Sequence, residues 1–592
     1  MKTKIYSLLG ACLLIVSSCS LDETPLSQIS ESEAYKSEKL LYINTVGTVV
    51  SGLGTVFKGN TDALCTIQDI AGGQLFNPGR GGGDWQDGGK HQVLFMHTWR
   101  EDNGYMSSGW NALWGKVAAI NKAIGTIEQY KSDYADPTDL DNWIYELRGL
   151  RAVFYWYLLD MYGNVPICET SDQTVAETVP SSRIEVYEFV RDELSEVIPH
   201  LIDAQCQNAS DEYYGRVTKA VGYFIMARLA LNAPVYLTTD TKVFATNTSI
   251  EEVNSYINES GKNIQFTLDG ETRNAWETVI YCQEKCAELG YTLQSNFADN
   301  FDVSNDKGNV ENIFVIPRDD TSFQVNDQDL QRSLHGNHGA YLGMANCWNG
   351  LAGTRATVFA FGYDFDGDTD YDPRWDDTFY YGFPAGEENK EQIASGYTYN
   401  GENDPDGIKD KLQYGYYYPH KVFSEQSTEL AALGYEGSVY DVYLKWGGAR
   451  YKKYQYDPTC SGMLRSNADF AIFRYAELLL AAGEAKFRNG QDGSNEINEV
   501  RSRAKAAIAS DIDMEFIRQE RIRELCFEGI CRTDEIRFGT FTKETVDRHY
   551  GMIPFSDAYG KFEADNDGHT ILFAIPSSAM QTNTNIVQNP GY

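Results

Sequence analysis

The acidic segment DFDGDTDYD, residues 364–372, is the first place where residue types and spacing could do chemistry. Asp364, Asp366 and Asp368 alternate with other residues around one glycine, and carboxylate oxygens are the ligands that calcium prefers. The glycine stands at the fourth position of the segment, whereas an EF-hand loop has it at the sixth. We therefore favour a solvated acidic loop and no cofactor, with calcium binding as the alternative.

A cysteine pair offers a second kind of chemistry. Cys282 and Cys286 lie four residues apart in YCQEKCAELG and would share one face of a helix, where two thiolates could bind a metal. No second pair of ligands lies nearby in the sequence. We therefore expect two buried free thiols and no metal site here.

The sequence lacks the short motifs of several enzyme classes. HExxH, GxSxG and the Walker A phosphate loop are absent. The segment most similar to Walker A is GDWQDGGK at residues 83–90, but its first glycine is one residue too far from the Gly-Lys pair. In addition, His91 replaces the Ser or Thr that binds magnesium. A glycosidase needs only two suitably placed carboxylates, which so acidic a sequence always offers, so a surface glycoside hydrolase stays open as an alternative.

The net charge of the chain limits the classes of ligand that it can bind. Among 592 residues, 85 acidic and 50 basic side chains give a formal net charge of −35. Such a surface repels nucleic acid and anionic lipid, and it suits a neutral ligand better than a polyanion. Aromatic residues are abundant, with 39 Tyr, 28 Phe and 10 Trp, and many lie in stretches rich in Gly, Asn and Asp, where they have less reason to belong to a core.

The first residues resemble the leader of a bacterial lipoprotein. Lys2 and Lys4 precede an apolar run, residues 5–16, which two serines and Cys19 follow. The resemblance implies cleavage after residue 18 and acylation of the Cys19 thiol; the alternative is an ordinary signal peptide with an incidental cysteine. After this leader we expect no uninterrupted apolar run of the roughly 18 residues that a membrane span needs, so the lipid would hold the protein at the membrane.

Helical patterns dominate the first 240 residues and return after residue 465. The periodicity predicts helices within 137–166, 181–201, 215–237, 466–490 and 516–539. Antiparallel helix pairs of this size resemble degenerate tetratricopeptide units. Between them, residues 296–465 read as long loops and short strands, which are usually functional, and residues 571–592 read as a strand-like run and a turn-rich tail.

The fold class that these patterns predict is mainly α. We expect a signal peptide at 1–18 and one unit at 19–592. That unit would have a helical region at 19–295, a loop-rich, ligand-facing region at 296–465, and a helical region with a tail at 466–592.

Four segments together resemble the SusD/RagB family. They are LRGLRAVFYWYLLDMYGNVPI at 147–167, FRYAELLLAAGEA at 473–485, ERIRELCFEG at 520–529, and IPSSAMQTNTNIVQNPGY at 575–592. The sequence departs from the family pattern at Cys531, where Arg is usual and Arg532 follows one place later, and at Ala579, where Glu is usual. Alternating Glu520, Arg521, Arg523, Glu524 and Glu528 would form charge pairs along one helix, a structural role.

The resemblance implies a SusD-like α-helical scaffold and an outer-membrane nutrient-binding lipoprotein of Bacteroidetes. Such proteins are not enzymes; they bind oligosaccharides or polysaccharides at the cell surface and deliver them to a SusC-like TonB-dependent transporter. Asp22 and Glu23 also resemble the surface-export signal of lipoproteins in that phylum. A peptide-binding RagB-like protein is the alternative within the family, and a purely structural lid for the transporter is another.

For a glycan ligand, the expected site stacks aromatic rings on sugar faces and places amides or carboxylates around the rim. Two loop clusters match this pattern and lie in regions comparable to those that supply binding aromatics in the family. They are Asp84, Trp85 and Gln86 in GGGDWQDGG, and Tyr341, Asn346, Trp348 and Asn349 in GAYLGMANCWNG. Trp375 is a weaker candidate, and we expect the tryptophans in helical rhythm to be core: Trp110, Trp114, Trp143 and Trp156.

Overall fold

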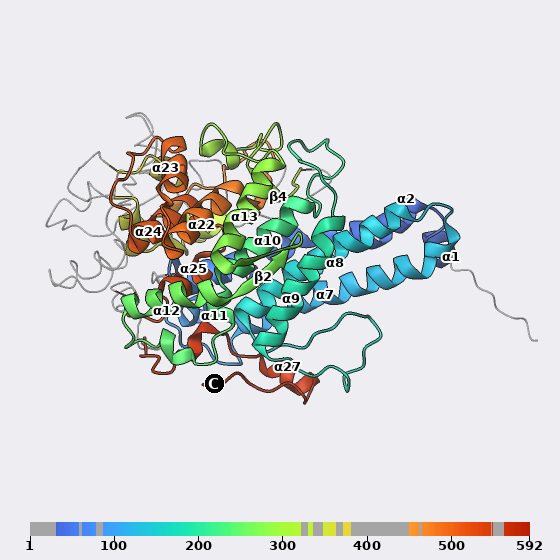
Figure 1. Ribbon diagram of the computed structural model, residues 1–592, viewed down its shortest axis with the longest axis horizontal. Coiled ribbons are helices and arrows are strands. Elements are labelled where there is room, and N and C mark those ends of the chain that lie inside the picture. Colours follow the sequence, from blue (N-terminus) through green and yellow to red (C-terminus); the bar gives the residue numbers. More distant parts are fainter. Residues whose placement is uncertain are drawn as a thin grey trace, which may run out of the picture.

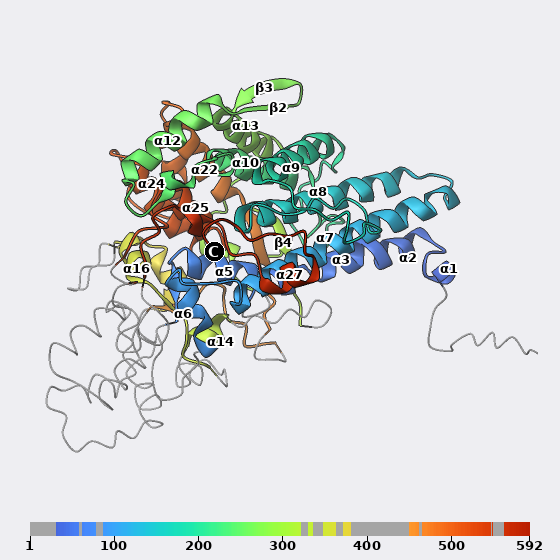
Figure 2. The same cartoon turned by 90° about the horizontal axis from the view of Figure 1, so that it is seen from below.

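The computed structural model describes residues 31–58, 62–77, 87–320, 329–334, 347–362, 371–380, 449–460, 465–545, 548 and 562–592. Within these residues the fold is mainly α, as predicted, and its few strands are short (Figures 1 and 2). A long helical arm projects from a rounder body (Figure 1).

The helices up to residue 288 form the arm and part of the body. Their bounds are α1 Glu31–Ala34, α2 Glu38–Tyr42, α3 Thr48–Ser51, α4 Leu53–Phe57, α5 Leu64–Ala71, α6 Lys90–Phe95, α7 Gly104–Tyr130, α8 Thr138–Met161, α9 Arg183–Val197, α10 Lys219–Leu231, α11 Ala233–Tyr236, α12 Ile250–Asn263 and α13 Ala275–Glu288. A π-helical turn at Ile43–Gly47 joins α2 to α3.

The later helices and all the strands complete the body. The helices are α14 Asp329–Ser333, α16 Arg355–Ala360, α17 Trp375–Thr378, α22 Tyr475–Arg488, α23 Ser494–Arg503, α24 Met514–Leu525, α25 Cys531–Phe538 and α27 Ser577–Thr582. The strands are β1 Leu75–Phe76, β2 Gln265–Leu268, β3 Glu271–Asn274, β4 Asn312–Ile316, β5 Ala352–Gly353, β6 Phe379–Tyr380, β7 Arg450–Tyr451 and β8 Phe470–Arg474. Each strand pairs with one other, antiparallel: β1 with β5, β2 with β3, β4 with β8, and β6 with β7.

The arm consists of α7, α8 and the helical run from α2 to α4, with α1 at its tip (Figure 1). The run Glu38–Phe57 is 20 residues long and, by length and composition alone, apolar enough to cross a membrane. Asn44, Thr45 and Thr48 interrupt it, so it is not the uninterrupted apolar run that a span was expected to need. It packs along α7, and 44% of its most apolar window is buried inside the protein.

Helix pairs of the tetratricopeptide type pack through the body, as predicted: α8 against α9, α10 against α13, and α13 against α22. The start of α9 is capped, because Ser182 and Glu185 form a reciprocal capping box. Thr218 occupies the position before α10, but its side chain makes no capping hydrogen bond. At the end of α8, Gly163 has a φ of +71°, a left-handed conformation that favours glycine, and the helix ends within the predicted range 137–166.

Three segments differ from the sequence expectation. Residues 470–474 form β8 rather than a helix, because all five side chains are buried and a short apolar run fits either structure. The predicted helix 516–539 is two helices, since Gly529, at φ +75°, approaches α5 so closely that a Cβ would lie 2.7 Å from Cys65. The strand-like run at 571–575 has no strand partner among the described residues, although the Phe573 N–H donates to the Met161 carbonyl oxygen at 2.7 Å.

The glutamates of α24 pair only in part along their own helix. Glu520 bonds Arg523 on the same helix at 2.8 Å, but it also bonds Arg374 at 2.6 Å. Glu524 contacts Arg374 at 2.9 Å, Arg474 at 3.0 Å, and Arg503. Glu528 lies beyond the end of α24 and bonds Arg474 at 2.6 Å. The helix therefore supplies carboxylates to arginines from distant segments.

This buried charge network consists of Glu311, Glu520, Glu524, Glu528, Arg374, Arg474, Arg501, Arg503, Arg523 and Lys453. Burial alone would raise the pKa of Glu520, but Arg374, Arg523 and Arg501 outweigh it and lower the pKa to about 2. In the same way, the facing arginines hold the pKa of Glu524 well below its usual range. Both carboxylates are therefore ionised at neutral pH.

Substitution Glu524→Gln is expected to lower the free energy of unfolding by about 3–5 kcal/mol. It keeps the shape of the side chain but leaves three buried arginines facing a neutral amide. Denaturant-induced unfolding measures the loss. Glu259→Gln is the matched control, because its pair with Lys262 has side chains 69% and 38% exposed and is expected to contribute at most about 1 kcal/mol. Equal, small losses in both variants would contradict a structural role for the network.

Candidate functional site

Four short strands form a frame in the part of the body where the predicted binding loops attach. In this strand frame β1 pairs with β5, β6 pairs with β7, and an isolated bridge between Gly353 and Ala449 joins the two pairs. After β5, Thr354 fastens the frame, because its N–H donates to the Gln74 carbonyl oxygen at 3.1 Å and its hydroxyl donates to the Gly73 carbonyl oxygen at 2.7 Å.

The frame brings together the described ends of the two segments that hold the predicted aromatic clusters in the sequence. The segment that holds Asp84, Trp85 and Gln86 follows β1, and the segment that holds Trp348 precedes β5. Phe76 and Ala352 are register partners of an antiparallel pair, so the chain leaves β1 at the same edge where it enters β5. Two segments about 260 residues apart in the sequence are thereby attached side by side.

Most of the predicted site residues lie outside the described residues. They are Cys19, Asp84, Trp85, Gln86, Tyr341 and Asn346, together with the calcium candidates Asp364, Asp366 and Asp368. Trp348 and Asn349 are described, and the structure assigns them different environments.

Trp348 is half-buried next to the strand frame. Its backbone N–H donates to the carbonyl oxygen of Gln331, at 2.7 Å, which ties the segment to α14. The neighbouring Cys347 is also half-buried, and burial raises the pKa of its thiol to about 11, so the thiol is neutral at physiological pH. Trp348 therefore combines a fixed backbone with an indole that is partly open to solvent, as a stacking platform requires.

Asn349 is part of the frame rather than of its surface. It is only 2% exposed, and its side-chain oxygen accepts a hydrogen bond from the guanidinium of buried Arg450 at 2.8 Å. Its φ of +54° is left-handed, a conformation that Asn tolerates better than most residues. The position of Asn349 therefore does not favour the predicted contact with a ligand, because its side-chain amide already binds Arg450 inside the protein.

The burial of the tryptophans differs in part from the prediction. Trp110 and Trp156 are buried, as predicted, and so is Trp375, whose ring centroid lies 4.6 Å from that of Phe379. Trp114 and Trp143 are only half-buried, because segments distant in the sequence leave hollows beside them. Helical periodicity identifies which side of a helix faces the protein interior. It does not show which residues on that side are left uncovered because the segments packed against the helix end before reaching them.

Two hollows were not anticipated from the sequence. The first has a volume of about 510 Å³ and lies between α7, the chain at 166–178 and α27, with Trp110 and Trp114 in its wall. None of the described residues that line it is charged. The second, of about 360 Å³, lies on the arm between Tyr42, Trp143 and Tyr213. Single-sequence patterns do not reveal such sites, because each is assembled from segments far apart along the chain.

The two cysteines of α13 are buried free thiols, as predicted. Cys282 and Cys286 are each 0% exposed, and neither is in a disulfide. Burial raises the pKa of both thiols, so they remain protonated, which does not favour metal binding.

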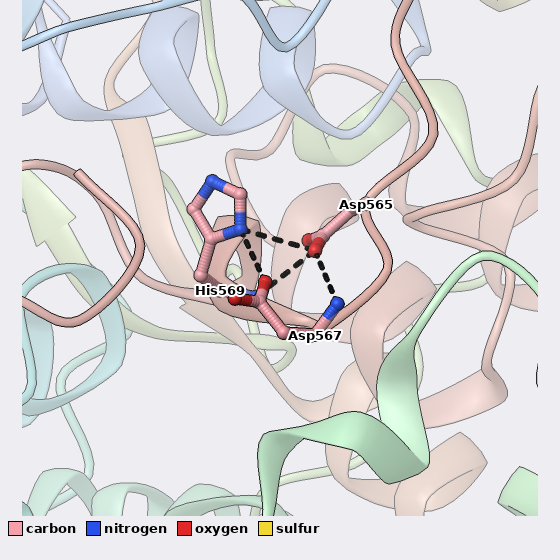
Figure 3. A group of neighbouring side chains, drawn as sticks. All are labelled: Asp565, Asp567 and His569. Carbon is pink, nitrogen blue, oxygen red and sulfur yellow. Dashed lines mark hydrogen bonds and ion pairs between the residues drawn. The ribbon is translucent and has the colours of Figure 1, made fainter.

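One trio of metal-ligating side-chain types lies close together within the described residues: Asp565, Asp567 and His569, whose ligand atoms are within 4.8 Å of one another (Figure 3). The oxygens of Asp565 already accept the N–H of Gly568 at 2.7 Å, and the N–H and hydroxyl of Thr570 at 2.9 and 2.5 Å. His569 Nδ1 bonds both carboxylates, and its hydrogen bond to Asp565 raises the pKa of the imidazole. The trio thus forms a hydrogen-bonded turn near the C-terminus.

Substitution Asn349→Ala is expected to lower the free energy of unfolding by about 1–3 kcal/mol, because it leaves the buried Arg450 without one acceptor. Denaturant-induced unfolding measures this loss. Trp348→Ala is the matched neighbour and should cost less, since its indole is only half-buried. A larger loss for Trp348→Ala than for Asn349→Ala would overturn this division of roles.

Comparison with known proteins agrees with this architecture. The family model described as the SusD family matches residues 263–592. The starch-binding protein SusD of Bacteroides thetaiotaomicron is 25% identical over 487 residues, which cover 76% of this chain and 72% of that protein. A SusD-like protein of Bacteroides ovatus is 22% identical over 324 residues, covering 53% of this chain and 50% of that protein.

Solved structures show the same fold at lower sequence identity. A laminarin-binding SusD-like protein is 17% identical, covers 94% of this chain and 100% of its own, and has a TM-score of 0.60. The surface glycan-binding protein A of Bacteroides thetaiotaomicron, in complex with laminarihexaose, is 16% identical, with coverages of 93% and 99% and a TM-score of 0.59. Because the family model matches more than half of the sequence, the chain belongs to the SusD family.

Proposed function

We propose that this protein is a non-catalytic, cell-surface glycan-binding protein that delivers an oligosaccharide or polysaccharide to a SusC-like TonB-dependent transporter for nutrient uptake. The observation that carries the proposal is the match to the starch-binding protein SusD over 487 residues, beside a shared fold with a protein solved with laminarihexaose. The lipid on Cys19 would hold the protein to the outer membrane, facing outward.

The ligand-binding surface would consist of the two loops that leave the β1–β5 edge of the strand frame. This arrangement supports the proposal, because Trp85 and Trp348 belong to segments that start from paired strands. Two aromatic platforms at this edge would suit a chain of sugar rings. The formal charge of −35 favours a neutral glycan over an acidic one.

The environment of Asp469 rules out this one carboxylate as the general acid of a glycosidase. A glycosidase needs a carboxylic acid with a raised pKa that can reach the glycosidic oxygen. Burial raises the pKa of Asp469 to about 6, which suits a general acid. However, Asp469 is 1% exposed, and its oxygens accept the Tyr214 hydroxyl at 2.5 Å and the Arg318 N–H at 2.6 Å, so no sugar reaches it.

The chain that starts after Cys19 should be retarded by a neutral polysaccharide in affinity electrophoresis. The panel includes starch, laminarin and an acidic polysaccharide, and calorimetry measures the affinity. Trp85→Ala and Trp348→Ala are each expected to weaken binding at least about tenfold, because each removes a stacking platform. Phe359→Ala is the control, since it removes an aromatic ring that is 39% exposed on α16 outside both clusters.

Several outcomes would contradict the proposal. Release of reducing ends from the bound polysaccharide would establish a hydrolase. No retardation across the panel would favour the peptide-binding alternative or a structural lid. Equal weakening by Phe359→Ala would remove the special role of the two loop tryptophans.

A further inference from the structure

The second hollow, on the arm, has the composition of a ligand site. It has a volume of about 360 Å³ and lies between α2, the first turns of α8, and the chain at 212–216. Its walls are formed by Glu38, Lys39, Tyr42, Asp139, Asn142, Trp143, Glu212, Tyr213 and Arg216. Both α2 and α8 belong to the arm, whereas α14, next to Trp348, lies on the body (Figure 2). The arm hollow is therefore separate from the site proposed at the strand frame.

Three half-buried aromatic rings surround this hollow. The rings of Tyr42 and Trp143 have centroids 5.2 Å apart at an interplanar angle of 60°, so they form two walls at an angle. Burial raises the pKa of Tyr42 to about 12, which keeps its phenol neutral and able to donate a hydrogen bond. Flat rings with a polar rim match the faces and hydroxyl groups of a sugar.

Arg216 holds the walls in place. It forms an ion pair with Glu146 at 2.5 Å, and both side chains are nearly buried. Its guanidinium carbon lies 5.0 Å from the ring centroid of Tyr42 and 4.5 Å from that of Tyr213. These contacts join α2, α8 and the 212–216 segment, so the hollow is largely formed before a ligand arrives.

Several polar side chains at the rim of the arm hollow have no internal partner among the described residues. Within the described part of the chain, Asn142 and Glu212 have no hydrogen-bond or ion-pair partner, and the same holds for Glu38 and Asp139. An amide and several carboxylates can accept or donate the hydrogen bonds that sugar hydroxyls need. This differs from the buried charge network of the body, where each glutamate faces arginines.

The charges select the class of sugar. Glu38, Asp139 and Glu212 face one lysine, Lys39, because Glu146 already neutralises Arg216. A uronic acid or a sulfated sugar would be repelled. The same carboxylates would attract a basic peptide side chain, which is therefore the competing ligand that the test must distinguish. A neutral sugar ring can still stack on Trp143 and bond the rim.

We propose that the arm hollow is a second, auxiliary binding site for a neutral sugar unit, with Trp143 as its stacking platform. The inference rests on the proposed glycan function and extends it to a site outside the strand frame. Two separated sites on one rigid protein would bind a long polysaccharide more tightly than a short oligosaccharide, because the second contact becomes intramolecular.

Fluorine NMR of the mature chain labelled with 5-fluorotryptophan tests both sites at once. Trp143, Trp348 and Trp276 are assigned by single Trp→Phe substitutions, and laminarihexaose and maltohexaose are the probes. Addition of one probe is expected to shift the Trp143 resonance and to leave that of Trp276 unchanged, since Trp276 is 0% exposed. An oligogalacturonate of equal length should bind more weakly than either neutral probe and should shift the Trp143 resonance less.

The outcomes distinguish the two proposals. A shift at Trp348 without one at Trp143 would overturn the auxiliary site and leave the proposed function standing. A shift at Trp143 alone would support the arm site and contradict binding at the strand frame. Unmoved resonances with both neutral probes, or a shift at Trp143 with a basic peptide instead, would overturn the sugar assignment.

A matched pair of variants measures the contribution to affinity. Tyr213→Ala is expected to weaken retardation by the long polysaccharide about fivefold to tenfold and to leave hexasaccharide binding at the strand frame unchanged. Tyr281→Ala is the control, a partly buried tyrosine of α13 that does not line the hollow. An unchanged affinity of folded Tyr213→Ala for the polysaccharide would contradict the proposal.

Discussion

The buried ion pairs of Glu524 are the interaction on which the rest of the structure depends. This carboxylate faces arginines from three other segments: Arg374 before α17, Arg474 at the end of β8, and Arg503 at the end of α23. Two strands of the frame are anchored the same way, because Arg374 shortly precedes β6 and Lys453, which follows β7, bonds Glu528 at 2.5 Å. The charges therefore join the helical scaffold to the frame that carries the predicted binding loops.

The sequence predicted what is local. Helices α8 and α9 and the buried thiols of α13 follow from spacing and burial within one segment. The sequence did not reveal what distant segments decide. The sequence of β8 suggested a helix, because its pairing with the distant strand β4 is not visible in the sequence. Asn349 suggested a ligand contact, because its hydrogen bond with Arg450 is not visible in the sequence either.

The same distinction explains the candidate sites. Aromatic, glycine-rich loops identified two clusters, but only the pairing of β1 with β5 indicates that they start from one edge. The arm hollow was missed because Trp143 has a helical spacing, whereas its neighbours Tyr42 and Tyr213 come from segments about 100 and 70 residues away. The helical scaffold thus presents aromatic groups on the arm as well as on the body, in a protein whose negative charge favours neutral ligands.

Hydrogen–deuterium exchange of the chain, with and without a neutral polysaccharide that retards it, tests whether the two loops at the β1–β5 edge bind one glycan. Peptides spanning 77–90 and 340–351 are expected to become protected together, because both loops leave the β1–β5 edge and would bind one ligand. Peptides of α12, on another part of the body, should exchange at the same rate in both samples. Protection in neither loop, or in one loop alone, would contradict a glycan-binding surface built on that edge.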